Sequence, residues 1–204
     1  MKVKRLYTIG DSWTYGHDLE NPKEQSWPTL LSREFDCELM NNAENGGSND
    51  WMFRKTVEWV SEHKNFDDTI VIVAWSEPNR REENYEFYNG SRLAGDKIEQ
   101  FIFNELHNDD LAHYKSISYI VTLQEFLKSK NIKYLFFQPW YDLVGWHGYY
   151  RVIKQIDKKY CIGPFVEGYK KEYLVDKIVP SHPNKKEHKI MTKFIKEKLV
   201  ELYG

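Results

Sequence analysis

The sequence of 204 residues contains only two cysteines, Cys37 and Cys161, no long hydrophobic run and almost no net charge. Two cysteines cannot build the disulfide framework of a small secreted protein. No segment approaches the roughly 20 apolar residues of a membrane span. The 29 basic and 31 acidic residues give a net charge of -2, so no overall field attracts the chain to nucleic acid or to anionic lipid. We therefore expect neither a nucleic-acid nor a membrane partner.

The sequence also lacks the motifs of targeting and of cofactor binding. Its first residues, MKVKRLYTIGDS, place Gly and Asp where a secretory signal peptide needs an apolar stretch. Together with the free thiols, this predicts a cytoplasmic protein. No HExxH, paired CxxC or P-loop motif occurs, so we expect no metal and no cofactor.

What the chain does have is a regular alternation of apolar segments. Four runs have the length and composition of strands, and four longer segments have helical spacing: strands at 3–9, 37–40, 69–75 and 132–138, and helices at 26–35, 52–60, 111–130 and about 184–202. This alternation predicts an α/β fold with a parallel sheet. The length predicts a single domain over residues 1–204, with polar and aromatic insertions near 76–108 and 139–170 that cover the carboxyl edge of the sheet.

The first strand ends in the segment Gly10-Asp11-Ser12-Trp13-Thr14-Tyr15-Gly16. A serine just beyond a strand projects its hydroxyl into the crevice at the carboxyl edge of an open α/β sheet, where ligands bind. Ser12 is therefore a candidate nucleophile. Asp11 is expected to stabilise its own turn by hydrogen bonds to the backbone.

Two further segments could complete a site around Ser12. Ser181-His182-Pro183-Asn184 directly precedes the last helix, and a histidine fixed there could act as the base that a serine nucleophile needs. The loop at 41–49 follows the second strand, and the N–H of a glycine in it could bind an oxyanion. His147 is an alternative base, whereas His188, inside the last helix, is expected to be a packing residue.

Taken in this order, the three segments resemble the SGNH, or GDSL-type, hydrolase family. GDSWTYG is similar to the first block of the family, the residues Asn41, Ala43, Gly46 and Ser48 fit the spacing of the second, and His182 with Pro183 and Asn184 fits the last. The resemblance implies a three-layer α/β/α, flavodoxin-like fold with a mainly parallel sheet of about five strands. It further implies that Ser12 is the nucleophile, that His182 is the base, and that the N–H groups of Ser12 and Gly46 bind the oxyanion.

Two departures from the family pattern concern the same site. The third block of the family, Gly-x-Asn-Asp, corresponds here to 74–79, so that Ser76 replaces the asparagine and Asn79 lies three residues further on. Either could serve as the third oxyanion donor, Ser76 through a bridging water. The family aspartate three residues before the histidine is replaced by Val179. Asp176 is the first candidate to orient His182, and a carboxylate elsewhere or a backbone carbonyl is the alternative.

The unusually high aromatic content, 16% of the residues, allows two interpretations. Large side chains can form a core and a lid, or they can stack on a sugar or an aromatic group of a substrate. The candidates for substrate binding are Trp13, Trp75, Trp140 and Trp146.

These residues support two hypotheses about function. The first is a serine hydrolase that removes an acyl group from a small-molecule ester or an acylated glycan, for example a carbohydrate O-deacetylase. The second is a catalytically impaired binding or assembly protein on the same scaffold, because fold does not fix function.

Overall fold

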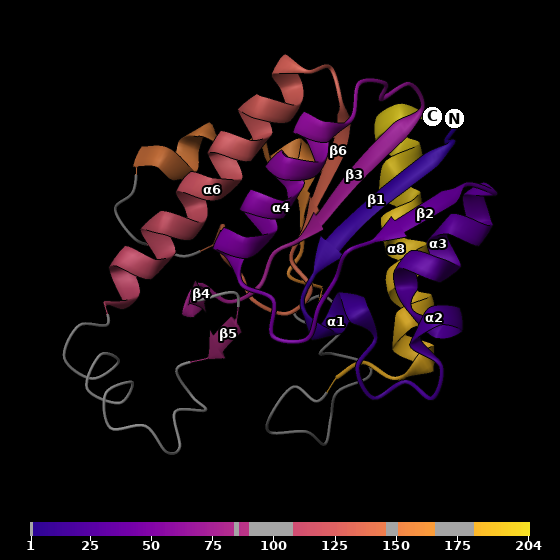
Figure 1. The fold of residues 1–204 in the computed structure, drawn as a ribbon, viewed down its shortest axis with the longest axis horizontal. Helices are drawn as coiled ribbons and strands as arrows, with labels where there is room; N and C mark the ends of the chain where they lie inside the picture. Colours follow the sequence, from indigo (N-terminus) through magenta and orange to yellow (C-terminus); the bar gives the residue numbers. More distant parts are fainter. Residues whose placement is uncertain (1, 84–85, 90–107, 146–150, 166–181) are drawn as a thin grey trace.

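The computed structural model describes residues 2–83, 86–89, 108–145, 151–165 and 182–204. Its centre is a five-stranded sheet of order β2–β1–β3–β6–β7 in which every neighbouring pair is parallel (Figure 1). The strands are β1 (Arg5–Gly10), β2 (Glu38–Asn41), β3 (Thr69–Ala74), β6 (Lys133–Phe137) and β7 (Cys161–Ile162). Counted along the chain within this sheet, the order is 2-1-3-4-5, which is the flavodoxin-like order. The expected α/β fold with a parallel sheet is confirmed.

Helices cover both faces of the sheet, which gives three layers (Figure 1). The longer helices are α3 (Trp27–Phe35), α4 (Asn49–Glu62), α6 (Asp109–Ser129) and α8 (Lys185–Tyr203). Helices α4 and α6 pack on one face, and α3 and α8 on the other. Each face buries its own apolar cluster. Both chain termini lie at the end of the sheet opposite to the short helix α1 (Ser12–Tyr15).

The burial of the strands follows their composition. Every residue of β3, with the sequence TIVIVA, is buried, as expected for a central strand that has helices on both sides. Strand β2 lies at the edge and leaves Glu38 and Asn41 exposed. Strands β1 and β3 are neighbours in the middle of the sheet, so their carboxyl ends adjoin. This is the point where the strand order reverses.

Several short elements were not predicted from the sequence. They are α1, α2 (Pro22–Gln25), the antiparallel pair β4 (Arg80–Glu83) and β5 (Glu86–Asn89), the 3-10 helices η3 (Arg151–Gln155) and η4 (Lys158–Tyr160), and strand β7. Each spans five residues or fewer, which is too short for a hydrophobic period to be recognised. The pair β4–β5 lies in the first predicted insertion, and β7 in the second.

Helix α8 begins at a well-defined cap. The Asn184 side chain accepts hydrogen bonds from the N–H groups of Lys186 and Glu187, and the Glu187 carboxylate accepts one from the Asn184 N–H. This reciprocal arrangement is a capping box. This cap fixes the start of α8 and so the position of His182, which lies two residues before Asn184.

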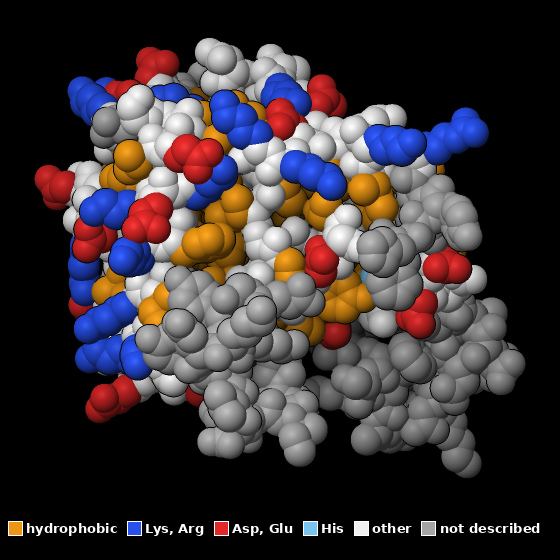
Figure 2. Space-filling view, turned by 180° about the vertical axis from the view of Figure 1, so that it is seen from behind, with side chains coloured by type: hydrophobic (Ala, Val, Ile, Leu, Met, Phe, Trp, Pro, Cys, Tyr) orange, Lys and Arg blue, Asp and Glu red, His pale blue; other side chains and the backbone are white. Residues whose placement is uncertain are grey.

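The surface carries charge of both signs. On the face seen in Figure 2, Lys and Arg side chains are interspersed with Asp and Glu, and hydrophobic side chains reach the surface between them. None of the helices in the described ranges is long and apolar enough to cross a membrane.

Candidate active site

The turn that carries Ser12 requires the glycine before it. A Cβ atom on Gly10 would lie 2.7 Å from Thr14 Cβ and 2.9 Å from Ala74 Cβ, so only glycine allows β1 to turn this closely into α1. Asp11 is the N-cap of α1 and accepts a hydrogen bond from the Trp13 N–H. Ser12 is thereby the first residue of the helix, at the carboxyl edge of the sheet between β1 and β3.

His182 lies beside Ser12, as expected. Its Nε2 atom is 3.0 Å from Ser12 Oγ, although the two residues are 170 positions apart in the sequence. This separation is within the reach of direct proton transfer. The end of β1 and the segment before α8 thus supply the two side chains of a dyad.

The other ring nitrogen of His182 contacts a carboxylate from elsewhere in the chain, the stated alternative to Asp176, and the residue is Asp18, which the sequence did not single out. His182 Nδ1 is 3.0 Å from Asp18 Oδ2. The chain reaches this point through a tight turn after α1, where Gly16 has a φ of 90° and Asp18 a φ of 68°. Glycine and aspartate are among the residues that tolerate these left-handed angles. The first candidate, Asp176, lies outside the described residues.

The contact with Asp18 determines the tautomer of His182. A carboxylate only accepts hydrogen bonds, so Nδ1 must carry the proton. The Nε2 atom of the neutral ring is then an acceptor, and it can take the proton of the Ser12 hydroxyl. The geometry is thus that of a Ser-His-Asp triad. The side chain of His182 is 27% exposed and that of Asp18 63% exposed, so the triad opens to solvent on the aspartate side.

Gly46 lies in a loop that packs on the carboxyl end of β1, the strand that precedes Ser12. The Glu44 N–H donates to the Gly10 carbonyl, and a Cβ atom on Gly47 would lie 3.0 Å from that same oxygen. Gly46 itself has a φ of 80°. Within the described residues, neither the Ser12 N–H nor the Gly46 N–H donates a hydrogen bond, so both are available to an oxyanion.

Ser76 and Asn79 do not occupy the positions expected of a third donor. Ser76 is completely buried and its Oγ donates to Asp11 Oδ2 at 2.8 Å, so its hydroxyl proton is already used. Asn79 lines a different cavity, of about 160 Å³, between α4 and α6. Replacing the family asparagine with serine has turned this position into a structural contact.

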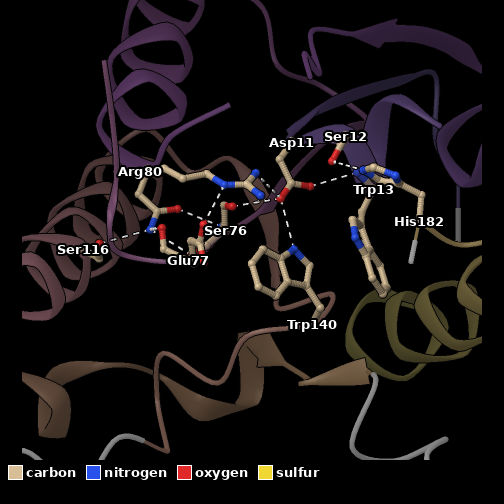
Figure 3. Close-up of polar contacts among 10 residues, drawn as sticks. Asp11, Ser12, Trp13, Ser76, Glu77, Arg80, Ser116, Trp140 and His182 are labelled. Atoms are coloured by element: carbon tan, nitrogen blue, oxygen red, sulfur yellow. Dashed lines mark hydrogen bonds and ion pairs between the residues drawn. The ribbon is translucent and has the colours of Figure 1, made fainter. Parts of the chain in front are cut away.

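Asp11 does more than stabilise its own turn (Figure 3). Its Oδ2 atom accepts hydrogen bonds from Ser76 Oγ, from Arg80 Nη1 at 2.9 Å and from Trp140 Nε1 at 3.1 Å. The Arg80 side chain is 11% exposed and Asp11 is fully buried. Asp11 therefore joins three segments, those that follow β1, β3 and β6.

The asparagine at the start of α4 fixes the end of β3. The Asn49 side chain accepts a hydrogen bond from the Ser76 N–H at 2.8 Å and donates to the Ser76 carbonyl at 3.0 Å. It also donates to Ser116 Oγ in α6. No sequence motif marked this residue, because its partners lie 27 positions or more away along the chain.

The four tryptophans proposed to bind substrate differ in position. Trp75 is fully buried, with its ring packed edge-on against Phe136 in the core beneath α4 and α6, so it is a core residue and the expectation was wrong. Trp13 and Trp140 stack at a centroid distance of 6.4 Å beside Asp11 and Ser12. Trp146 lies outside the described residues, as does His147.

Three other potentially reactive side chains in the described ranges, Cys37, Cys161 and His188, are not activated. Burial raises the pKa of Cys37 to about 11 and that of Cys161 to about 12, so neither thiol is a ready nucleophile. His188 is fully buried in α8, and burial lowers its pKa to about 4. It is a packing residue, as expected. One group of possible metal ligands does occur in the described part of the chain: His17, Asp18 and His182.

Comparisons with known proteins identify the fold. No curated protein sequence matches the chain. Among solved structures, it is similar to the psychrotrophic esterase EstA from Pseudoalteromonas sp., in a structure inhibited by monoethylphosphonate (13% identity, TM-score 0.57, 98% of both chains covered). It is also similar to a putative lipolytic protein of the G-D-S-L family from Desulfitobacterium hafniense (16%, 0.52, 96% of this chain and 99% of the other). A third similar structure is the acetyl xylan esterase AlAXEase (13%, 0.54, 98% and 100%).

These likenesses extend over nearly the whole chain, and they show that it has the fold of the GDSL-type, or SGNH, hydrolases. A family model described as a family of unknown function, DUF6071, matches residues 11–115. The match begins at the Asp11–Ser12 turn and includes Asp18, Gly46 and Ser76. With half of its 204 residues inside this match, the chain belongs to the DUF6071 family and is a divergent member of the SGNH fold.

Proposed function

We propose that the protein is a serine esterase in which Ser12 is the nucleophile, His182 the general base and Asp18 the residue that orients the base. One observation carries the proposal: His182 bonds to Ser12 Oγ through Nε2 and to the Asp18 carboxylate through Nδ1, each at 3.0 Å. A histidine that only packs in the core does not require a serine hydroxyl at one ring nitrogen and a carboxylate at the other. The contact pattern is the one that activates a serine in acyl transfer.

The proposed reaction has two steps. Ser12 Oγ attacks the ester carbonyl while His182 Nε2 takes the hydroxyl proton, and the imidazolium then gives that proton to the departing alcohol. Water, activated by the same nitrogen, hydrolyses the acyl-Ser12 intermediate. The Asp18 carboxylate stabilises the positive ring in both steps, and the Ser12 and Gly46 N–H groups bind the oxyanion.

Two oxyanion donors instead of three limit the rate. Removing one such donor typically costs about 3–4 kcal/mol of transition-state stabilisation. Ser76 is held by Asp11 and Asn79 lines another cavity, so neither replaces the missing side chain. We therefore expect activity on small or activated esters, such as an aryl acetate, to exceed activity on unactivated ones.

An acetylated glycan is the first class of natural substrate to test. One structure of similar fold is an acetyl xylan esterase. In this chain the stacked pair Trp13–Trp140 lies beside Ser12, and aromatic faces bind the apolar faces of sugars. Small acyl groups also suit a site with only two backbone donors.

A fluorophosphonate probe tests the activated serine without knowledge of the substrate. We expect a covalent adduct on Ser12, found by mass spectrometry of the digested protein, and hydrolysis of an aryl acetate. Ser12→Ala should abolish both. Ser32→Ala is the matched control, because the Ser32 hydroxyl donates to the Thr29 carbonyl in α3, and it should leave both intact.

The binding-protein hypothesis makes the opposite prediction. If the unmodified protein takes up no probe at Ser12 and its residual hydrolysis equals that of Ser12→Ala, Ser12 does no chemistry. The protein would then be a binding protein that keeps the geometry of this site, and the altered third block would indicate that catalysis has been lost.

A further inference from the structure

Three donor side chains converge on the outer side of the triad. His182 Nδ1 lies 3.0 Å from Asp18 Oδ2, and His17 Nε2 lies 3.5 Å from Asp18 Oδ1. The rings of His17 and His182 meet edge to face at a centroid distance of 4.4 Å. One ligand atom from each of the three residues lies within 4.8 Å of the other two. The proposed hydrolysis assigns no role to His17. Its imidazole contacts Asp18 and His182 in this cluster.

We propose that His17, Asp18 and His182 form a site for a late first-row divalent metal ion of the Zn²⁺ type. Two imidazole nitrogens and one carboxylate oxygen are a ligand set that such ions prefer, and an open fourth position for water is common. Ligand atoms about 2.1 Å from a tetrahedral Zn²⁺ lie about 3.4 Å apart. Each imidazole nitrogen lies about that far from an oxygen of the Asp18 carboxylate, His182 Nδ1 3.0 Å from Oδ2 and His17 Nε2 3.5 Å from Oδ1. The side chains of His17 and Asp18 are 46% and 63% exposed, so an ion can enter from solvent.

Metal binding and general-base catalysis exclude each other at this site. In the triad, the Nδ1 atom of His182 carries the proton and Nε2 is free to accept one. When Nδ1 gives its lone pair to a metal, the proton of the neutral ring must move to Nε2, which then cannot accept the proton of Ser12. The metal also takes the Asp18 carboxylate. The site is therefore inhibitory, a consequence that rests on the proposed function, whereas the binding itself does not.

Calorimetric titration of the intact protein with ZnCl₂, after treatment with a chelator and dialysis, tests the binding. We expect one Zn²⁺ per chain, and His17→Gln should weaken its binding by about tenfold or more. Ser12→Ala keeps all three ligands and should bind as the parent does. His63→Gln is the matched control, since His63 contacts the Trp59 carbonyl in α4. Mg²⁺, which prefers oxygen ligands, should not bind detectably.

Equal Zn²⁺ affinity in the parent and in His17→Gln would overturn the site, and so would no binding at millimolar Zn²⁺. Circular dichroism of each variant shows whether it is folded. Because the His17 side chain is exposed, we expect His17→Gln to fold.

A kinetic experiment tests the inhibition separately. Zn²⁺ should block aryl acetate hydrolysis at the concentration where it binds, a chelator should restore the rate, and His17→Gln should shift the inhibitory concentration by the same factor as the affinity. Binding without inhibition would overturn the competition between metal and base. A parent protein with no esterase activity at all would contradict the proposed function, while the calorimetric result would still decide the metal site.

Discussion

At the scale of single residues, the aspartate that contacts His182 is Asp18, near the start of the chain. The family pattern suggests an aspartate near the other end of the chain. Asp18 follows Ser12 by six residues, whereas the family places its aspartate just before the histidine. The one-turn helix α1 and the left-handed Gly16 reverse the chain. This reversal brings the Asp18 carboxylate to the Nδ1 atom of His182.

Asp18→Asn should lower kcat/KM for an aryl acetate by about 10- to 100-fold. The corresponding change in a buried triad costs about 10⁴, but here the carboxylate is largely exposed and water can replace part of its effect. The control is Asp36→Asn, which changes another exposed aspartate with positive φ, at the end of α3, and should leave the rate unchanged. An unaltered rate in Asp18→Asn together with a loss in Asp176→Asn would transfer the role to Asp176.

At the scale of secondary-structure elements, the buried Asp11 carboxylate connects the segments around Ser12. Arg80, at the start of β4, pairs with both Asp11 and Glu77 and places its guanidinium over the Trp140 ring at 5.3 Å. The first insertion is thereby attached to the turn that carries Ser12. A buried pair of this kind is costly to break from one side, because the remaining charge stays buried.

Arg80→Met should lower the free energy of unfolding by about 3 kcal/mol, measured by urea denaturation. The value lies near the lower end of the range for a broken buried ion pair, because Asp11 keeps its bonds to Ser76, Trp140 and the Trp13 N–H. Arg33→Met removes an exposed arginine that pairs with Glu24 and should cost less than about 1 kcal/mol. Similar losses in the two variants would show that the Asp11–Arg80 pair is not a special contact.

At the scale of the whole molecule, a buried histidine joins the last helix to the first long one. His188 Nδ1 accepts a hydrogen bond from the Trp27 N–H at 3.1 Å. Trp27 is the first residue of α3, where a backbone N–H has no partner within the helix. The contact requires an unprotonated Nδ1, so this link between helices α3 and α8 depends on a neutral imidazole.

The burial of the His188 imidazole, which lowers its pKa, predicts that the protein loses stability on mild acidification. The pKa of His188 is lowered to about 4 in the folded protein, whereas the unfolded chain has the ordinary value of about 6.5. The unfolded state therefore takes up the proton first as pH falls. Stability from this group is full above about pH 6.5, and about 3 kcal/mol of it is lost by about pH 4.

Urea denaturation at several pH values between 4 and 7 measures this loss, with His188→Gln as the comparison. The stability difference between the parent and His188→Gln should shrink as pH falls through this window. His63→Gln, which changes a half-buried histidine at the C-cap of α4, should follow the parent. Parallel pH profiles for the parent and His188→Gln would exclude His188 as the source.

The sequence alone was sufficient for the layers of the fold and for two members of the site. Runs such as TIVIVA and the amphipathic helices reveal their burial through local periodicity, so the parallel α/β sheet followed from them. Ser12 and His182 were recognisable because each lies at a fixed place beside an element boundary, after β1 and before α8. Their 3.0 Å separation is seen only in the tertiary structure.

Only the tertiary structure decided which partners these residues have. The contacts of Asp18 with His182, of Ser76 with Asp11, and of Trp75 with the core depend on how the chain turns within a few residues and on which segments adjoin across the sheet. Side-chain type gives no information on that, because aspartate, serine and tryptophan serve structural and chemical roles equally well. The sequence thus determined the scaffold and the dyad, and packing around the carboxyl ends of β1 and β3 decided the rest of the site.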